Sequence, residues 1–502
     1  MAPIASTIGG SLPARYPACY DARIAFACTT AAIVLAGCAP QLSERRSPIA
    51  AGTLAAARSL DAPAAAWPAA DWWRAFGDPQ LDVLEAEALA GRPTLREADA
   101  RARSVSAAAR EQAADTGPQL AAEAAASGVR VTRNQGFPDD IKEYLPRGLH
   151  SQGRLRLNLS WMLDFFGRNR AAVAAARSEA EAARLDVAAA RLFLSTAVAS
   201  SYAELGRLFR LRRAAEDALA VRRETLALLS RRLAQGLATA PERNQEATYV
   251  PVSEGEVAAI ARQIAVTRHQ IAALLGAGPD RGLAIAPPVA DGSYALALPA
   301  SLPLELVGRR PDLAAARARV EAADERVTVA RRDFYPNINL VALAGVQSFG
   351  IADLFTRDAL AGSAGPAIGL PIFQGGRLRA RLSRAVAGYD EAVADYDALL
   401  VGAIRDVADV LAAQRAVGVQ LDAAQRAESS ADAAYAGTRR RYAGGLTSHL
   451  EVLTAENGLV ARRREVADLT GQRLALDIDL IRVLGGGFVA PDAPNPEGTI
   501  HG

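Results

Sequence analysis

The side chains that most often carry chemistry are few and scattered in this sequence. None of the histidines has the spacing to a cysteine or an acidic residue that a metal site needs. They are His150, His269, His449 and His501, and His449 is expected to be an exposed turn residue rather than a ligand. The chain has no phosphate-binding loop ending in Gly-Lys-Ser/Thr and no Gly-x-Ser-x-Gly nucleophile motif. The sequence therefore predicts no catalytic residues, no metal site and no cofactor site.

Composition excludes one class of partner and favours one class of structure. The 502 residues include 57 basic and 55 acidic side chains, so the chain lacks the basic excess expected of a nucleic-acid-binding protein. Half of the residues are hydrophobic, but only 5% are aromatic, and alanine is abundant. Such a composition is typical of long helices that pack closely.

A repeated stretch reveals how the chain is organised. The segment Arg231–Thr239 reads RRLAQGLAT, and Arg440–Ser448 reads RRYAGGLTS, so that Gly236 recurs as Gly445, 209 positions later. The pairs Gly167-Arg168 and Leu275-Gly276 recur at the same offset. Three markers in one register indicate that a long module has been duplicated.

The duplication continues upstream with a different offset. Arg92-Pro93-Thr94-Leu95 recurs as Arg310-Pro311-Asp312-Leu313, and Pro118-Gln119-Leu120 recurs as Pro336-Asn337-Ile338, both 218 positions later. The first copy therefore has extra residues between Leu120 and Gly167, which is tolerated best in a loop. Each copy is predicted to contain a helix, a strand, a loop, a strand, a long helix, a tight turn and a second long helix.

Two stretches have the alternation of a half-buried strand. Between positions 154 and 163, apolar residues face one way, and Arg154, Arg156, Asn158 and Ser160 face the other. In the second copy, Asn337 and Asn339 lie opposite an apolar series that begins at Ile338. We expect strands at 118–132, 151–163, 336–348 and 363–373. Four strands cannot close a barrel, so a membrane barrel would need strands from several subunits.

The longest segments are predicted helices. No proline occurs between Arg168 and Ala234, a length that spans about 100 Å as a helix. Apolar residues recur there and after each turn at three- and four-residue steps, which predicts antiparallel coiled-coil pairs. A large helical bundle is the alternative interpretation. Pro251 predicts a kink or break at 249–255 that the second copy lacks.

The N-terminus has the features of a secreted, lipid-anchored protein. Residues 1–37 combine positive charge with a short apolar segment, as a signal peptide does. The segment Leu35-Ala36-Gly37-Cys38 resembles the bacterial lipoprotein box, which implies a diacylglycerol and an N-acyl chain on Cys38. An ordinary signal with an incidental cysteine is the alternative. The other two cysteines lie within the signal, so no internal disulfide is expected.

Several motifs in this order resemble one family, the TolC-like outer-membrane efflux channels, and within it the NodT-type lipoprotein branch. The resemblance covers about residues 35–487. The motifs that carry it are Leu35–Cys38, Phe76-Gly77-Asp78-Pro79, Arg92-Pro93, Arg309-Arg310-Pro311-Asp312-Leu313, Phe373-Gln374-Gly375-Gly376-Arg377-Leu378 and Arg441-Tyr442-Ala443-Gly444-Gly445-Leu446.

The resemblance implies a mostly helical α+β fold and a homotrimer in the outer membrane. Each subunit would give four strands to a shared twelve-stranded transmembrane β-barrel, and its coiled-coil hairpins would form a periplasmic tunnel. A periplasmic adaptor and an inner-membrane pump would dock on it, and small molecules such as drugs would leave through it. The implied divisions are a signal peptide at 1–37, an anchored lead at 38–70, a first repeat at 71–276, a linker at 277–305, a second repeat at 306–487 and a tail at 488–502.

The same resemblance places the two tight turns, with Gly236 and Gly445, at the periplasmic tip. Glu242 and Glu451 are equivalent residues just past each turn. In a trimer they would form carboxylate rings that favour cations, although a glutamate in a first helical turn also suits the helix dipole. Many relatives have Leu-Asp-Ala after the second turn, where this chain has Leu453-Thr454-Ala455, so a gate built on that aspartate is in doubt.

Other residues receive roles from the resemblance as well. Arg440, Arg441 and Tyr442 are candidates for holding the tip closed, or are ordinary helix-end cations. The polar strand residues Arg154, Arg156, Asn158, Asn337 and Asn339 are candidates for the barrel lumen. The remaining alternatives are a periplasmic lipoprotein adaptor, which explains the strand pairs poorly, and a coiled-coil envelope tether, which needs no polar strand face.

Overall fold

The computed structural model of the chain is mostly helical, with one four-stranded sheet, as predicted. It describes residues 45–61, 66–132, 138, 143–144, 147–289 and 308–489. The signal segment and Cys38 lie outside the described residues, as do His501 and most of the predicted linker and tail. Within the described ranges, no helix is both long enough and apolar enough to span a membrane.

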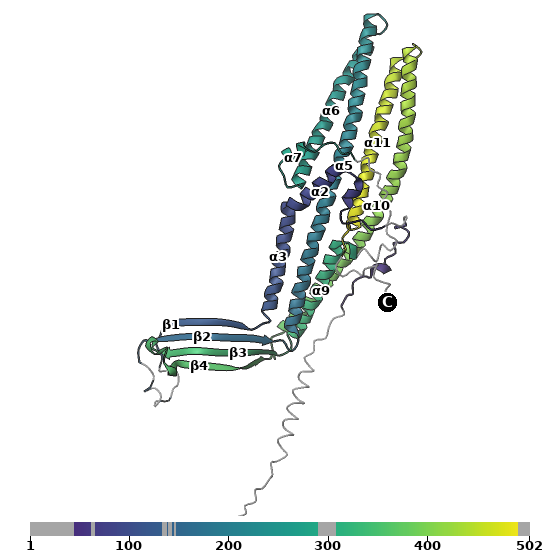
Figure 1. Cartoon of the computed structure of the whole chain (residues 1–502). Coiled ribbons are helices and arrows are strands. Elements are labelled where there is room, and N and C mark those ends of the chain that lie inside the picture. The colour runs from purple at the N-terminus through teal and green to yellow at the C-terminus, as the bar shows by residue number, and fades with distance from the viewer. Residues whose placement is uncertain are drawn as a thin grey trace, which may run out of the picture. The chain divides into compact units, whose positions relative to one another are not determined.

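The chain divides into two compact units (Figure 1). One contains Thr116–Arg170 and Val327–Ala387 and holds the sheet. The other contains Arg46–Asp115, Ala171–Arg326 and the chain from Gly388 onward, and it is helical.

Figure 1 shows the described elements. The lead and first copy contain η1 (Ala51–Thr53), η2 (Trp72–Phe76), α2 (Pro79–Gly91), α3 (Pro93–Ala114), β1 (Gln119–Val129), β2 (His150–Leu163), α5 (Arg168–Ala234), α6 (Ala240–Leu274) and α7 (Asp280–Leu283). The second copy contains α9 (Pro311–Arg332), β3 (Asn337–Phe349), η3 (Ile351–Asp353), η4 (Arg357–Ala359), β4 (Leu360–Gly369), α10 (Arg377–Ala443) and α11 (His449–Val483).

Three helices of the first copy have the same lengths as their counterparts in the second copy. Helices α5 and α10 each contain 67 residues, and α6 and α11 each contain 35. Helices α3 and α9 each contain 22. Because the long helices begin and end at positions that are 209 apart, the internal duplication read from the sequence is confirmed.

The sheet is antiparallel, with the strands in chain order β1-β2-β3-β4. The fourth strand lies earlier than the predicted 363–373, since it runs from Leu360 to Gly369. Gly369 pairs with Asn337, which is the first residue of β3, so β3 has no further residue to pair with the segment after Gly369. Gly375 and Gly376 then adopt φ values of 56° and 84° before α10 begins. The ladder therefore ends before the predicted boundary.

Two apolar clusters hold the helical unit together. The first includes Leu84, Leu205 and Ile271, and it also takes Ile478 and Ile481 from the second copy. The second surrounds Leu400, Val407 and Leu480, and it buries Ala51 and Ala56 of the lead. The lead is therefore part of the folded unit. Its backbone N–H groups at Arg46 and Ile49 donate to Asp390 and Asp397 of α10, at 3.3 and 2.8 Å.

The break considered at 249–255 does not occur, because α6 is continuous from Ala240 to Leu274 with Pro251 inside it. Pro251 is exposed, so water can solvate the carbonyl group that the missing N–H leaves without a helical partner.

Candidate functional site

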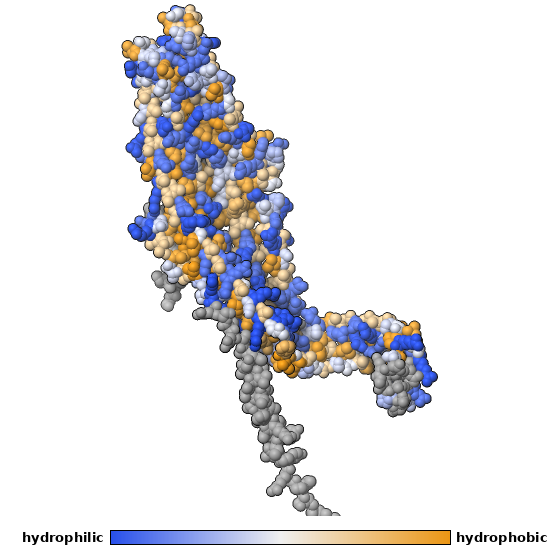
Figure 2. All heavy atoms as spheres, turned by 180° about the vertical axis from the view of Figure 1, so that it is seen from behind, coloured by the Kyte–Doolittle hydropathy of each residue, from blue (hydrophilic) through white to orange (hydrophobic). Residues whose placement is uncertain are grey.

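The sheet has one polar and one apolar face. The pairing register gathers onto the polar face Gln119, Glu123, Ser127, Arg154, Arg156, Asn158, Asn337, Asn339 and Gln347. Large apolar residues lie on the opposite face, and many are exposed: Leu120, Leu155, Leu157, Trp161, Leu360 and Ile368. Figure 2 shows orange hydrophobic residues on the surface of the strands. In the single chain, this apolar face lacks the cover that apolar surface normally has.

Charged side chains on the polar face have polar partners on neighbouring strands. Arg154 Nη2 lies 2.6 Å from Glu123 Oε1, and each side chain keeps 43% of its surface exposed. Arg156 donates a hydrogen bond to Gln347. The role of Glu123 was not anticipated, because the alanine-rich first strand has only a weak strand pattern and its register cannot be read without its partner.

A buried acid ties together the segments where strands meet helices. The side chain of Asp333, only 7% exposed, accepts hydrogen bonds of 2.6 Å from Arg168 and from Arg381. At the start of α5, Asp164 accepts from the backbone N–H groups of Asn169 and Arg170, at 3.1 and 2.9 Å. These contacts fix the ends of β2 and α9 and the starts of α5 and α10 within the sheet unit.

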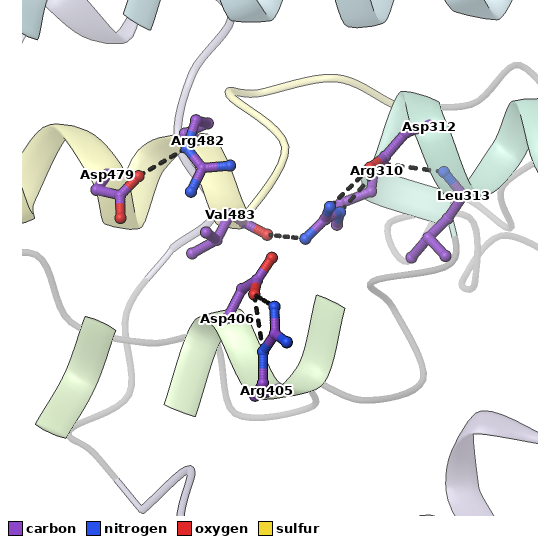
Figure 3. Close-up of polar contacts among 8 residues, drawn as sticks. All are labelled: Arg310, Asp312, Leu313, Arg405, Asp406, Asp479, Arg482 and Val483. Carbon is purple, nitrogen blue, oxygen red and sulfur yellow. Dashed lines mark hydrogen bonds and ion pairs between the residues drawn. The ribbon is translucent and has the colours of Figure 1, made fainter. Parts of the chain in front are cut away.

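The Arg-Pro-Asp-Leu motif has a structural role (Figure 3). Arg310, 7% exposed, donates to both carboxylate oxygens of Asp312, and its Nη1 lies 3.4 Å from the carbonyl oxygen of Val483 at the end of α11. A cation beside the last carbonyls of a helix offsets its dipole. The motif therefore joins the start of α9 to the end of α11.

The two turns have the same hydrogen bonds. Leu237 N donates to Arg232 O at 2.8 Å, and Leu446 N donates to Arg441 O at 2.9 Å. Gly236 and Gly445 follow the helix ends with φ values of 65° and 74°, which glycine adopts without strain. This is the Schellman ending of a helix, and it makes both turns tight.

The two equivalent glutamates differ in their surroundings. Glu242 forms a capping box with Thr239, whose N and Oγ1 donate to its carboxylate at 2.7 and 2.8 Å. These bonds hold the pKa of the Glu242 carboxyl below its usual value, and the bond from the backbone N–H of Thr239 contributes most. Glu451 is exposed in the first turn of α11.

Of the three other tip candidates, one contacts the neighbouring hairpin. Arg440 and Arg441 are exposed at the end of α10. Tyr442 is half-buried, and the guanidinium carbon of Arg232 on α5 lies 4.5 Å from the centre of its ring. The structure thus brings Tyr442 to the other hairpin and leaves the arginines at the surface.

Near the turns lies a buried polar group that the sequence did not reveal. We name Arg222, Glu246, His449 and Glu456 the tip cluster. His449 Nε2 lies 3.4 Å from Glu246 Oε2, and Arg222 Nε lies 3.7 Å from Glu456 Oε1. The expectation that His449 is an exposed turn residue is wrong, because it is only 4% exposed. As the first residue of α11, it faces α6 of the other hairpin.

Comparisons with known proteins agree in pointing to one family. A model of the outer membrane efflux protein family matches residues 84–277 and 302–486. The fusaric acid resistance protein FusA of Burkholderia cepacia is 38% identical over 379 residues, which are 73% of this chain and 69% of that protein. The probable outer membrane lipoprotein SilC of Salmonella typhimurium is 29% identical and aligns over 91% of this chain and 97% of its own length.

A solved structure shows the same fold. The outer membrane protein VceC of Vibrio cholerae superposes with a TM-score of 0.79 at 38% identity, covering 84% of this chain and all of that chain.

Proposed function

Because this chain belongs to the outer membrane efflux protein family, it is an outer-membrane channel for efflux, and we propose that three copies form one continuous tunnel. The observation that carries this proposal is the amphipathic sheet, whose apolar face is exposed in the single chain. The tunnel would take small molecules, such as drugs, from an inner-membrane pump through a periplasmic adaptor to the exterior.

Unpaired strand edges support assembly. In one copy, β1 and β4 are the two edges of the sheet. A sheet edge in lipid must find partners for its N–H and C=O groups. Pairing β4 of one copy with β1 of the next would provide them and close a twelve-stranded barrel. Its apolar face would meet lipid, and Arg154, Arg156, Asn158, Asn337 and Asn339 would line the lumen.

The hairpins are proposed to form the periplasmic tunnel. Gly236 and Gly445 would lie at its tip, where the adaptor docks, and Arg440, Arg441 and Tyr442 would help to hold that end closed. Three copies of Glu242 and Glu451 would add carboxylate rings that favour cations. The exposed carboxylate of Glu451 suits this role better than that of Glu242, which the capping box already engages.

Lipid attachment at Cys38 completes the proposal. The chain has the lipoprotein-box residues Leu35–Cys38, and SilC is named as an outer membrane lipoprotein. Acyl chains contribute about 0.8 kcal/mol per buried CH₂, so the modified cysteine would anchor the lead in the membrane.

Ion selectivity in planar bilayers tests the lumen assignment. We expect Arg154→Glu and Arg156→Glu to shift the reversal potential toward cation preference, because each replaces a lumen cation with an anion. Arg357→Glu, in the exposed segment between β3 and β4, serves as the control and should change it little. Unchanged potentials in both strand variants would contradict the assigned face.

Negative-stain electron microscopy of the detergent-extracted protein tests the assembly. Elongated particles with three-fold symmetry support the channel. Compact monomers or six-membered rings would instead favour an adaptor or an envelope tether.

A further inference from the structure

The tip cluster joins three of the four long helices near their turns, and the fourth contacts it. Arg222 comes from α5, Glu246 from α6, and His449 and Glu456 from α11. Helix α10 adds Tyr442, whose ring centre lies 5.6 Å from that of His449. Glu246 and Glu456 are 0% and 2% exposed. Charged groups this deeply buried are costly unless they compensate one another.

The duplication shows that this cluster belongs to one interface only. At an offset of 209, each of its members corresponds to an alanine in the other copy. Ala431 is the equivalent of Arg222, Ala455 of Glu246, Ala240 of His449 and Ala247 of Glu456. Those alanines are exposed or half-buried in the single chain. The helical repeat itself therefore does not require the polar residues, and they mark the contact between the two hairpins of one chain.

Charge balance indicates what the cluster binds. With both glutamates ionised and His449 neutral, one guanidinium faces two carboxylates, and the buried group carries a net negative charge. One added proton, on His449 or shared with a carboxyl, makes it neutral. Both carboxylate oxygens of Glu246 and Glu456 and both ring nitrogens of His449 lack a hydrogen-bond partner among the described residues. They are thus available to hold that proton.

We propose that the tip cluster is a proton-binding site that holds the two hairpins of one chain together at their tips and releases them when the proton leaves. Loss of the proton leaves an uncompensated negative charge between the hairpins, and water entering the contact relieves it. The proposal concerns contacts within one chain, so it goes beyond the channel function and does not depend on how many copies assemble.

The surrounding groups are consistent with proton uptake. Arg222 also donates to Asn457 at 2.6 Å and lies over the ring of Tyr249. Farther out are Glu242, which interacts with His449, and Tyr435, which interacts with Glu456. Burial raises the pKa of the Glu456 carboxyl; the Arg222 guanidinium opposes this shift and Glu246 adds to it.

The direction of the pH effect follows from that raised pKa. A carboxyl that binds its proton more tightly when the hairpins are closed stabilises the closed form at low pH. This stabilisation is lost as the pH rises above the usual pKa of a glutamate and through the raised pKa of Glu456.

Distances between spin labels in the full-length protein test the proposal. Gln235→Cys and Gly444→Cys place equivalent, exposed labels on the two turns. Labelled chains diluted with unlabelled ones would report distances within one chain. We expect one short distance at about pH 5 and a growing longer-distance population toward about pH 8. One proton can change the ratio of the populations by at most about tenfold per pH unit.

Two substitutions test whether charge balance in the tip cluster controls the contact. Glu456→Gln and Glu246→Gln each remove one carboxylate, which balances the cluster without a proton, so both should keep the short distance throughout the pH range. Glu254→Gln is the control, since this exposed glutamate pairs with Arg223 within one hairpin, and it should behave as the wild type does. A wild-type distance that does not change with pH overturns the proposal. So does a change that persists in both cluster variants.

Discussion

At the scale of single residues, Asp477 illustrates how a buried carboxyl links folding to pH. It lies on α11, is 3% exposed, and accepts one hydrogen bond of 2.8 Å from Gln414 on α10. Burial raises its pKa to about 7. Because the folded value is above the unfolded one, the protein should lose stability as the pH rises from about 4 to about 7.

Replacing Asp477 with asparagine should remove this loss. An amide keeps the shape and an acceptor for Gln414 but carries no charge, so Asp477→Asn should stabilise the hairpin by about 2–4 kcal/mol at pH 8. At about pH 4 it should have little effect. Thermal unfolding at the two pH values measures the difference. Asp422→Asn, in an exposed pair with Arg426, is the control. A gain of equal size at both pH values would contradict the assignment.

Arg310 supports a second prediction at this scale. Its guanidinium is buried and joins Asp312 to the end of α11, so Arg310→Ala should reduce the unfolding free energy by about 2–4 kcal/mol. Arg317→Ala breaks an exposed pair with Glu321 and should cost less than about 1 kcal/mol. Denaturant unfolding would compare the two. Equal losses of unfolding free energy in the two variants would contradict a stabilising role for the buried Arg310 contact.

At the scale of elements, the two descending helices differ by one proline. Helix α6 contains the exposed Pro251, whereas α11 has Val460 at the equivalent position. Pro251→Ala restores a backbone donor, so it should stabilise the first hairpin by about 1–3 kcal/mol. Hydrogen exchange at residues 247–255 should slow in this variant. The neighbouring exposed Val252→Ala is the control, and equal exchange in both variants would argue against a weak point at the proline.

The element scale also shows how far a sequence can be read. The bounds of α5 and α10 follow from Gly167, Gly236 and their equivalents, because glycine marks where a helix begins or ends. Apolar periodicity alone does not locate those positions. The polar and apolar strand faces follow from simple alternation. These are local features, and local features are visible in the sequence.

Contacts between distant segments were not visible. The pairing of Arg154 with Glu123 depends on a strand register, and the tip cluster depends on which helix faces meet. His449 looks like an exposed turn residue in the sequence because its burial comes from α6, which precedes it in the chain by about 200 positions. The prediction placed the last strand too late because the alternation of apolar residues continues past Gly369, whereas the hydrogen-bonded ladder ends there.

At the scale of the whole molecule, the lead connects the proposed anchor to the helical unit. Cys38→Ser removes the thiol that would receive the lipid, so the signal segment should remain attached and the acyl mass should be absent. Mass spectrometry of the membrane fraction measures both. Cys28→Ser, within the signal segment, is the control. A wild-type chain that lacks acyl groups would contradict the lipoprotein assignment.

The equal lengths of the two hairpins have a consequence for how this gene can change. A deletion within α5 or α6 alone would leave the first hairpin shorter than the second, so that its turn would no longer be level with the turn at Gly445. Length changes in the hairpins are therefore tolerated only when both halves of the gene acquire them together, whereas substitutions can accumulate in either half alone. The four alanines equivalent to the tip-cluster residues reflect that freedom, because each half has alanines where the other has charged or polar residues, while the two hairpins have kept the same length.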